Sequence, residues 1–210
     1  MAQLTGNIEH FLFKVAGLDQ ELKVVRFRGT ETLCRMYQYD LELACENPEL
    51  DFSTLIGQAG LLTCLGTHDN VERHVHGIIS EIRQGESGKR FTTYHVVLVP
   101  QLWLLNHRHD CRIFQNQSVP EIISQVFEDA GIPSDQYKFV LQSTYPRREY
   151  CVQYRESDLH FITRLMQQEG LFYYFEHSEK GHVAIFGDSP SAHKTITDPA
   201  TIPSVAIRAI

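Results

Sequence analysis

The sequence predicts a mainly β protein in which an antiparallel β-barrel-like domain precedes a smaller α/β domain with two helices. In the first hundred residues, apolar and polar side chains alternate with a period of two, and no long helical pattern interrupts them. Two capped helical patterns appear after residue 105, each with strand patterns beside it. A series of short strands without intervening helices is typical of antiparallel barrels and sandwiches.

Strand patterns fill the first part of the chain. Aromatic and β-branched residues occupy many of the alternating positions, as expected for half-buried strands. We expect strands at 11–15, 25–27, 37–43, 61–65, 71–82 and 91–100. The segment 50–57 predicts a short helical turn across one end, and the glycine-containing segment 84–88 predicts a hairpin turn between two long strands.

The first helix is predicted to begin at Ser118. Ser118 and Glu121 fit a capping box, and Pro120 lies in the first turn, where its missing N–H leaves no bond unmade. Gly131 and Pro133 end the pattern. The apolar stripe of this helix consists of Ile122, Ile123, Val126, Phe127 and Ala130.

The second helix is predicted to begin at Ser157 and to end at Gly170. Glu156 and Asp158 place negative charge at its positive N-terminal end. Its apolar face consists of Leu159, Ile162, Leu165 and Met166. Further strands are expected at 137–142, 149–154, 171–176 and 182–186, the last two joined by a turn at 178–181.

The end of the sequence changes character again. Residues 187–199 are rich in Ser, Asp and Pro and are predicted to form a loop. An apolar, strand-like run follows at 202–210 without a closing turn. We therefore expect the natural protein to continue beyond this run.

Charge, hydropathy and cysteine usage argue against several classes of function. The formal net charge of −7 argues against a broad nucleic-acid-binding face. No apolar run approaches the length of a membrane span, and residues 1–10 lack the basic and apolar regions of a secretory signal peptide. The five cysteines are scattered and form no Cys-x-x-Cys pair, which favours a reduced, cytosolic state over a disulfide framework.

The best candidate for a metal site is the segment 107–111. His107, His109 and Cys111 are predicted to share one face of a strand, and zinc binds His and Cys side chains. Three neighbours on one strand rarely complete a tetrahedron, and nothing in the sequence places the fourth ligand beside them, for which His74 and His76 are the candidates. A polar strand face near a domain junction is the favoured interpretation, so we predict no metal and no cofactor.

Two patterns invite comparison with nucleophilic enzymes. The segment 187–189, Gly-Asp-Ser, is similar to the serine block of the Ser-Gly-Asn-His esterases, but no Asp-x-x-His pair follows it and Gly-Asp-Ser-Pro is also a common turn sequence. Cys111 lies beside His109, and Cys151 lies in an apolar strand pattern typical of packing. We therefore expect no catalytic residue and no enzymatic activity.

Basic and aromatic residues interleave along 145–155. Aromatic side chains among arginines are typical of binding to single-stranded nucleic acid. The alternative is a strand edge on which the arginines pair with Glu149, Glu156 or Asp158, and the negative net charge favours this alternative. Arginine and tyrosine are also enriched in protein interfaces, so an assembly role fits the same residues.

Four blocks of sequence, at 27–43, 55–58, 112–127 and 145–177, carry a family resemblance. They occur in the same order in the valine-glycine repeat protein G (VgrG) spikes of type VI secretion and in the related baseplate hub proteins of contractile phage tails. The block 145–177 resembles the family most, and Cys34 departs from it where a serine is expected. Family members continue into a second barrel, an OB-fold neck and a β-helical needle, which are not visible in the sequence.

The resemblance implies a division into domains and a mechanical function. It places the first hub β-barrel domain at 1–105, an α/β domain with two helices at 106–193 and the start of a truncated second barrel at 194–210. The implied function is a structural spike or hub subunit of a contractile injection machine. Such a subunit caps the hexameric Hcp tube and matches six-fold to three-fold symmetry. A baseplate hub protein of a contractile phage or phage-like tail is the alternative.

The same resemblance implies the partners and the location. The partners are two further copies in a full-length homotrimer, the Hcp tube, baseplate components and effectors, with no nucleic acid among them. The full spike, rather than this region, pierces the target membrane. Assembly in the bacterial cytoplasm is followed by secretion through the type VI machine to the exterior or into a target cell, without a signal peptide.

Overall fold

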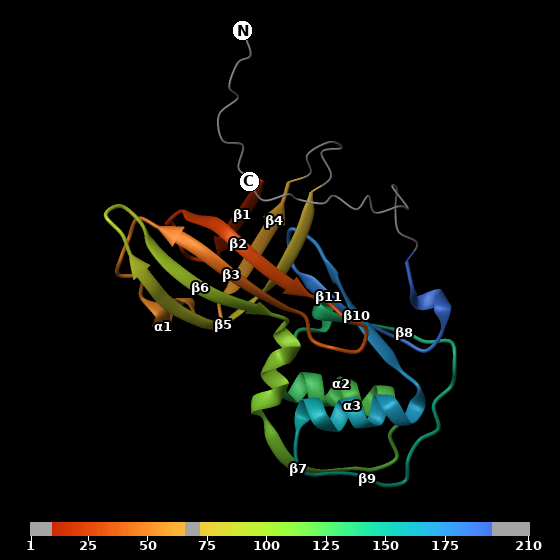
Figure 1. Cartoon of the computed structure of the whole chain (residues 1–210). Coiled ribbons are helices and arrows are strands. Elements are labelled where there is room, and N and C mark those ends of the chain that lie inside the picture. The colour runs from red at the N-terminus through yellow and green to blue at the C-terminus, as the bar shows by residue number, and fades with distance from the viewer. Residues whose placement is uncertain (1–9, 66–71, 195–210) are drawn as a thin grey trace.

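The fold is described from a computed structural model, which places residues 10–65 and 72–194. These residues form a closed barrel, a three-stranded sheet, a two-stranded ribbon and two long helices (Figure 1). The predicted mainly β fold with a smaller α/β part is therefore confirmed. Residues 195–210, which include almost all of the predicted second-barrel start, lie outside the described residues. Among the helices that are described, none has the length and apolarity of a membrane span.

Six antiparallel strands close into a barrel in the spatial order β1-β2-β3-β6-β5-β4, and pairing of β1 with β4 completes the ring. Because the sheet is closed, each of these strands pairs with a neighbour on both sides, and the sheet that they form has no edge strand. The strands are β1 (Phe11–Val15), β2 (Leu22–Thr30), β3 (Gln38–Cys45), β4 (Ala59–Cys64), β5 (Arg73–Ser87) and β6 (Thr92–Val99).

The apolar side chains that alternate along the predicted strands point inward and form the barrel core. In β3, Tyr39 and Leu41 are buried, whereas Asp40 between them is exposed, as the pleat of a strand requires. The predicted helical turn at 50–57 is confirmed by the short helix α1 (Phe52–Leu55), which covers one end of the barrel (Figure 1). Leu55 of α1 packs into the barrel core.

The hairpin between β5 and β6 turns later than the sequence predicts. β5 runs through most of the segment 84–88 and ends at Ser87, with a register shift after Gln84. The chain reverses at Gly88, whose N–H donates to the Phe91 carbonyl at 2.8 Å. The predicted hairpin is confirmed, but its turn begins at Gly88 rather than at Gln84, because Gly85 marks an irregularity inside the long strand.

The second part of the chain places two helices against both a ribbon and a sheet. Strands β7 and β9 form an antiparallel ribbon, and β10, β11 and β8 form a sheet in which β11 and β8 are parallel. The elements are the 3-10 helix η1 (Gln101–His107), β7 (His109–Phe114), α2 (Val119–Asp129), the 3-10 turn η2 (Ser134–Gln136), β8 (Tyr137–Val140), β9 (Cys151–Ser157), α3 (Asp158–Glu169), β10 (Phe172–His177), β11 (His182–Gly187) and the 3-10 turn η3 (Pro190–Ala192).

The helix signals in the sequence are confirmed at both helices. Glu121 accepts the Ser118 N–H at 2.8 Å, which is one half of the predicted capping box of α2. The Ser157 hydroxyl accepts the His160 N–H at 3.2 Å at the start of α3. That helix ends at Gly170, whose φ of +72° is left-handed and therefore favours glycine.

Two hydrophobic cores result. In the α/β part, α2 and α3 lie side by side between the ribbon and the sheet (Figure 1), and one core joins Phe114 of the ribbon, Phe161 of α3 and Phe186 of the sheet. A separate core fills the barrel. Phe175 of β10 packs against both cores. Leu105 belongs to the core of the α/β part, and the predicted domain boundary at 105/106 stays a prediction.

Candidate functional site

The residues considered as zinc ligands do not converge. His107 is the last residue of η1, whereas His109 and Cys111 belong to β7, and a register shift lies just before Cys111. The predicted common strand face is therefore wrong, because the chain leaves a 3-10 helix between His107 and His109. Within residues 10–65 and 72–194, no group of three or more His, Cys, Asp or Glu side chains is arranged to hold a metal ion.

Asp188 holds the segment 142–145 in place through hydrogen bonds. Its carboxylate accepts the N–H groups of Gln142 at 2.9 Å and Ser143 at 2.7 Å, and the Tyr145 hydroxyl at 3.0 Å. These donors, led by the Gln142 N–H, lower the pKa of Asp188 to about 2. Ser189 follows as the residue before η3. The geometry fits the turn interpretation of this segment.

The two candidate cysteine nucleophiles have opposite environments. Cys151 is buried in the core of the α/β part, which agrees with the packing interpretation. Cys111 is exposed on β7, and its N–H donates to the Asp110 carboxylate at 2.7 Å. All five cysteines lie in the described ranges and are free thiols.

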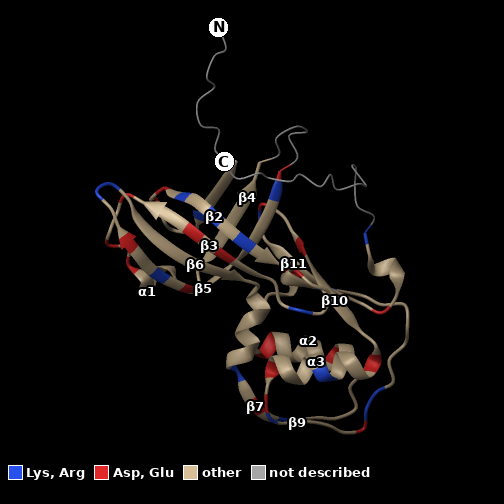
Figure 2. Cartoon of the chain, viewed as in Figure 1, with Lys and Arg blue, Asp and Glu red and all other residues tan. Residues whose placement is uncertain are grey.

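The arginines at the start of the basic and aromatic segment pair with acidic side chains of the helices. Arg147 contacts Glu121 of α2 at 2.6 Å, and Arg148 contacts Glu169 of α3 at 2.6 Å. Pairing of these arginines with acidic side chains agrees with the prediction, but the predicted partners Glu149, Glu156 and Asp158 were wrong, because the helices bring distant residues to this segment. Figure 2 shows the acidic residues on both helices and the basic residues near the ribbon that faces them.

The ribbon β7–β9 has an outer face that exposes apolar side chains, defined by Ile113, Val152 and Tyr154. Ile113 faces Val152 across the ribbon, and Ile113 and Tyr154 are 58% and 64% exposed. Tyr150, just before β9, is also exposed, and the Arg155 guanidinium lies over the Tyr154 ring at 5.2 Å from its centroid. Aromatic and arginine side chains of this kind are enriched in protein interfaces.

The inner face of the ribbon holds a buried ionic network, which we call the Asp158 cluster. Asp158 is 1% exposed, and its carboxylate accepts from Arg112 at 2.6 Å, Arg108 at 3.1 Å and Gln153 at 2.8 Å. Gln153 is fully buried and also accepts from Arg112 at 2.8 Å. Arg112 reaches Asp129 of α2 at 2.9 Å. The cluster thus links both strands of the ribbon to α2 and α3.

Sequence reasoning missed the Asp158 cluster. Asp158 was expected to favour the positive end of α3 or to pair with an arginine of 145–155, whereas its partners are Arg108 and Arg112. A carboxylate buried to this degree needs such charged or hydrogen-bonding partners. A usable signal was Gln153, which lies two residues after the buried Cys151 and therefore on the inward face of the same strand. A polar residue in phase with buried positions predicts a buried polar network, but its partners on β7 were not predictable from spacing.

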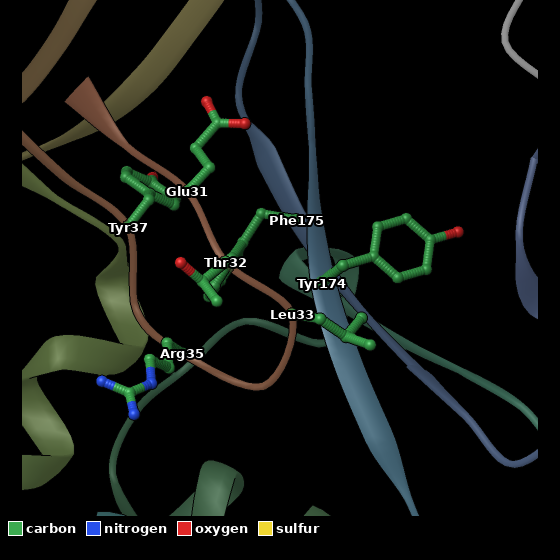
Figure 3. Close-up of a pocket in the computed structure, with 7 residues that line it drawn as sticks. All are labelled: Glu31, Thr32, Leu33, Arg35, Tyr37, Tyr174 and Phe175. Atoms are coloured by element: carbon green, nitrogen blue, oxygen red, sulfur yellow. The ribbon is translucent and has the colours of Figure 1, made fainter.

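A cavity of about 250 Å³ lies where the barrel meets β10. Figure 3 shows its walls, with the segment between β2 and β3 on one side and β10 on the other. Its Glu31 carboxylate already accepts from the Arg73 guanidinium at 2.8 Å and from the Tyr39 hydroxyl. We assign the cavity no ligand. The lining residues are Glu31, Thr32, Leu33, Arg35, Tyr37, Tyr174 and Phe175.

Comparison with known families gives a match over most of the chain. Residues 30–209 match the family model of the phage tail baseplate hub (GPD). Curated relatives include the type VI secretion system spike protein VgrG1b of Pseudomonas aeruginosa, 44% identical over 182 residues, and the spike protein VgrG3 of Vibrio cholerae, 37% identical over 206 residues. These matches cover 87% and 93% of this chain but only 24% and 20% of the relatives.

Solved structures share the fold. An E. coli protein, c3393, superposes with a TM-score of 0.80 at 28% identity, over 87% of this chain and 50% of that chain. That protein is a component of the type VI secretion system with structural similarity to the T4 bacteriophage tail proteins gp27 and gp5. A tail protein of Neisseria meningitidis, at 15% identity and a TM-score of 0.59, shares the fold over 89% of this chain and 52% of that chain. The chain belongs to the phage tail baseplate hub family, and it is similar within that family to the VgrG spikes of type VI secretion.

Proposed function

We propose that this chain is part of a structural hub subunit of a type VI secretion spike. The observation that carries the proposal is the match of the barrel and the α/β part together to c3393, with a TM-score of 0.80. Identities of 37–44% to VgrG spike proteins support the same assignment. Because the chain spans about a quarter of the length of those relatives, the function of the whole protein is part of the proposal.

In the proposed mechanism the region acts by shape. The closed barrel is one segment of a ring, and a second similar barrel in each of three subunits completes six segments around the axis. Such a ring presents six-fold symmetry to a hexameric Hcp tube and three-fold symmetry to the spike. A closed barrel suits this task because its backbone hydrogen bonds are satisfied internally, so contacts are made through side chains. Closed point-group symmetry is also the common form of soluble homo-oligomers.

The proposal places assembly in the bacterial cytoplasm, with baseplate components and effectors as further partners, followed by export through the machine itself. The full-length protein tests it directly. We expect light scattering to give the mass of a trimer and a surface-binding assay to detect Hcp hexamers. A monomeric mass together with no detectable binding to Hcp would contradict the proposal.

A hub in a contractile phage tail is the second candidate, because the matching family model is that of the phage tail baseplate hub. Neisseria meningitidis tail protein supports the shared fold alone at 15% identity. The two candidates differ in the tube that they cap. Binding of the full-length protein to Hcp but not to a phage tail-tube protein supports the spike, and the reverse preference supports the phage hub.

For this region we also propose a role without catalysis. One relative, 37% identical, is the actin cross-linking toxin VgrG1 of Vibrio cholerae, and this chain covers 18% of that protein. In a strain that lacks the full-length protein, we expect the Cys111→Ser and Ser189→Ala variants to restore Hcp export as well as the wild type does. Loss of export with either variant, at normal protein level, would point to a chemical role for that side chain.

A further inference from the structure

Three histidines meet where the β10–β11 hairpin touches the barrel. His76 lies on β5, His177 ends β10, and His182 begins β11 directly opposite His177. His74, two residues before His76, contacts Thr63 of β4 instead. Figure 1 shows β10 and β11 beside the barrel strands. Contact between these strands and β5 is direct, so the histidines lie at the junction of the two cores.

Two backbone N–H groups, one on β5 and one at the start of η1, donate to imidazole nitrogens of the hairpin. The His76 N–H donates to His177 Nδ1 at 3.2 Å, and the Gln101 N–H donates to His182 Nε2 at 3.0 Å. A backbone N–H can only donate, so both ring nitrogens must accept and therefore carry no proton.

These acceptors fix the tautomers. Since His182 Nε2 is unprotonated, the neutral ring carries its proton on Nδ1, which lies 3.2 Å from His76 Nδ1 and donates to it. His177 must carry its proton on Nε2, an atom that is buried without a hydrogen-bond partner among the described residues. Each hairpin ring is thus neutral in the folded chain. His177 accepts from the barrel strand β5, and His182 accepts from Gln101 at the start of η1, just after the barrel strand β6.

The surroundings disfavour a charged ring. The Tyr37 ring packs edge-on against His177 at 4.8 Å and against His182 at 5.9 Å between centroids. Burial lowers the pKa of His177 to about 4. The negative charge of Glu31 raises this pKa, and the positive charge of Arg73 lowers it further.

Burial, together with the two other histidines, lowers the pKa of His182 to about 3. Burial also lowers the pKa of His76. Of the charged groups that act on His177, Glu31 and Arg73 also lie beside Tyr39, and Arg73 lies beside Cys64.

We propose that neutral imidazoles of His177 and His182 latch the β10–β11 hairpin to the barrel and that acid opens this latch. Protonation puts an N–H on each accepting nitrogen, so that it faces a backbone N–H and the hydrogen bond is lost. The two attachments share His76, which supplies the N–H to His177 and the acceptor for His182. Opening therefore loosens the β10–β11 hairpin from the barrel, where Phe175 of β10 packs against both cores.

Proton linkage gives the direction in which the stability of the fold changes with pH. Between about pH 6.5 and about pH 4, the unfolded chain binds protons on both histidines that the folded chain does not bind. Stability therefore falls as the pH falls through this window. For each histidine that stays neutral in the fold, the unfolding equilibrium constant rises about tenfold per pH unit below about pH 6.

The test compares the 210-residue chain with the variant His177→Asn/His182→Gln, whose amide oxygens occupy the accepting positions and do not titrate. On going from about pH 7.5 to about pH 5, we expect the unfolding constant of the wild type to rise at least about tenfold more than that of the variant. His109→Gln, which changes an exposed histidine of β7, is the matched control and should keep the wild-type pH dependence. Equal pH dependence in the wild type and the double variant would overturn the proposal.

A second measurement needs no variant and covers the case in which the double variant does not fold. NMR titration of the wild-type chain follows the ring protons of His177 and His182 and the amide protons of His76 and Gln101. We expect the rings to stay neutral well below pH 6.5 and the two amide signals to move only when the rings are protonated. Rings that titrate near 6.5 while both amide signals stay unchanged would show that no latch exists.

Discussion

The barrel and the α/β part bury polar groups in different ways. In the barrel core the side chains are almost all apolar, and two of the three buried tyrosines donate their hydroxyl groups to backbone carbonyls: Tyr94 to Asn47 at 2.8 Å and Tyr37 to His76 at 2.5 Å. The third, Tyr39, donates to the Glu31 carboxylate. The α/β part instead buries a carboxylate, Asp158, and an amide, Gln153, which bond to each other and to Arg112.

The difference reflects the number of strand neighbours in each sheet. Barrel strands are paired on both sides, so the ring holds itself together around an apolar interior. The β7–β9 ribbon has only two strands, and an isolated two-stranded ribbon is marginally stable in water. Ion pairs from the ribbon to α2 and α3 supply the specific attachment that a missing third strand would otherwise give. We expect the two parts to respond differently to substitution.

The largest effect is expected from Asp158→Ala. The change leaves Arg112 and Gln153 in a buried site without their shared acceptor, so the free energy of unfolding should fall by about 3–5 kcal/mol. Chemical denaturation measures it. Asp129→Ala removes a 41% exposed partner of the same Arg112 and should lower stability by about 1 kcal/mol or less. Similar losses in both variants would mean that burial does not set the strength of the cluster.

Large-to-small substitution of the barrel core comes next. Leu43→Ala removes a fully buried side chain and should lower the free energy of unfolding by about 2–5 kcal/mol, and Leu165→Ala should do the same in the second core. Because Phe175 packs on both cores, we expect one shared transition, followed by circular dichroism and by the fluorescence of the single tryptophan, Trp103. Two separate transitions would show that the parts unfold independently.

A smaller effect is expected at the end of α3. Gly170 has a φ of +72°, and a left-handed conformation costs a residue with a Cβ about 1–2 kcal/mol, so Gly170→Ala should lower the thermal midpoint. Gly181, in the β10–β11 turn, has open space around its Cβ position and no positive φ. Gly181→Ala should therefore leave stability unchanged or raise it slightly. An equal loss at both positions would contradict this account of the helix end.

The smallest effect is expected on the outer face of the ribbon. Ile113→Thr and Val152→Thr change exposed, β-branched positions, so the free energy of unfolding should stay within about 0.5 kcal/mol of the wild type. The same ribbon would then tolerate change on one face and resist it on the other. A loss comparable to that of Asp158→Ala would show that the outer face is not free in solution.

The sequence by itself determined the local structure. Alternation predicted most barrel strands, and Ser118, Glu121, Ser157 and Gly170 located the helix ends, because caps and periodicity depend on residues a few positions apart. The turn after β5 escaped this reasoning, since a glycine signals both turns and bulges. The family resemblance, confirmed by the match to the baseplate hub model over residues 30–209, came from blocks of sequence rather than from any single site.

Only the tertiary structure decided which distant residues meet. Barrel closure pairs β1 with β4, and the ribbon brings Arg112 within 2.6 Å of Asp158, 46 positions away. His76 and His182, separated by 106 positions, share a hydrogen bond at the junction. None of these contacts leaves a periodic trace in a single sequence, because partner choice across a fold depends on strand order and on which side chains become buried together. Spacing can place a residue on a face, but only packing chooses its partner.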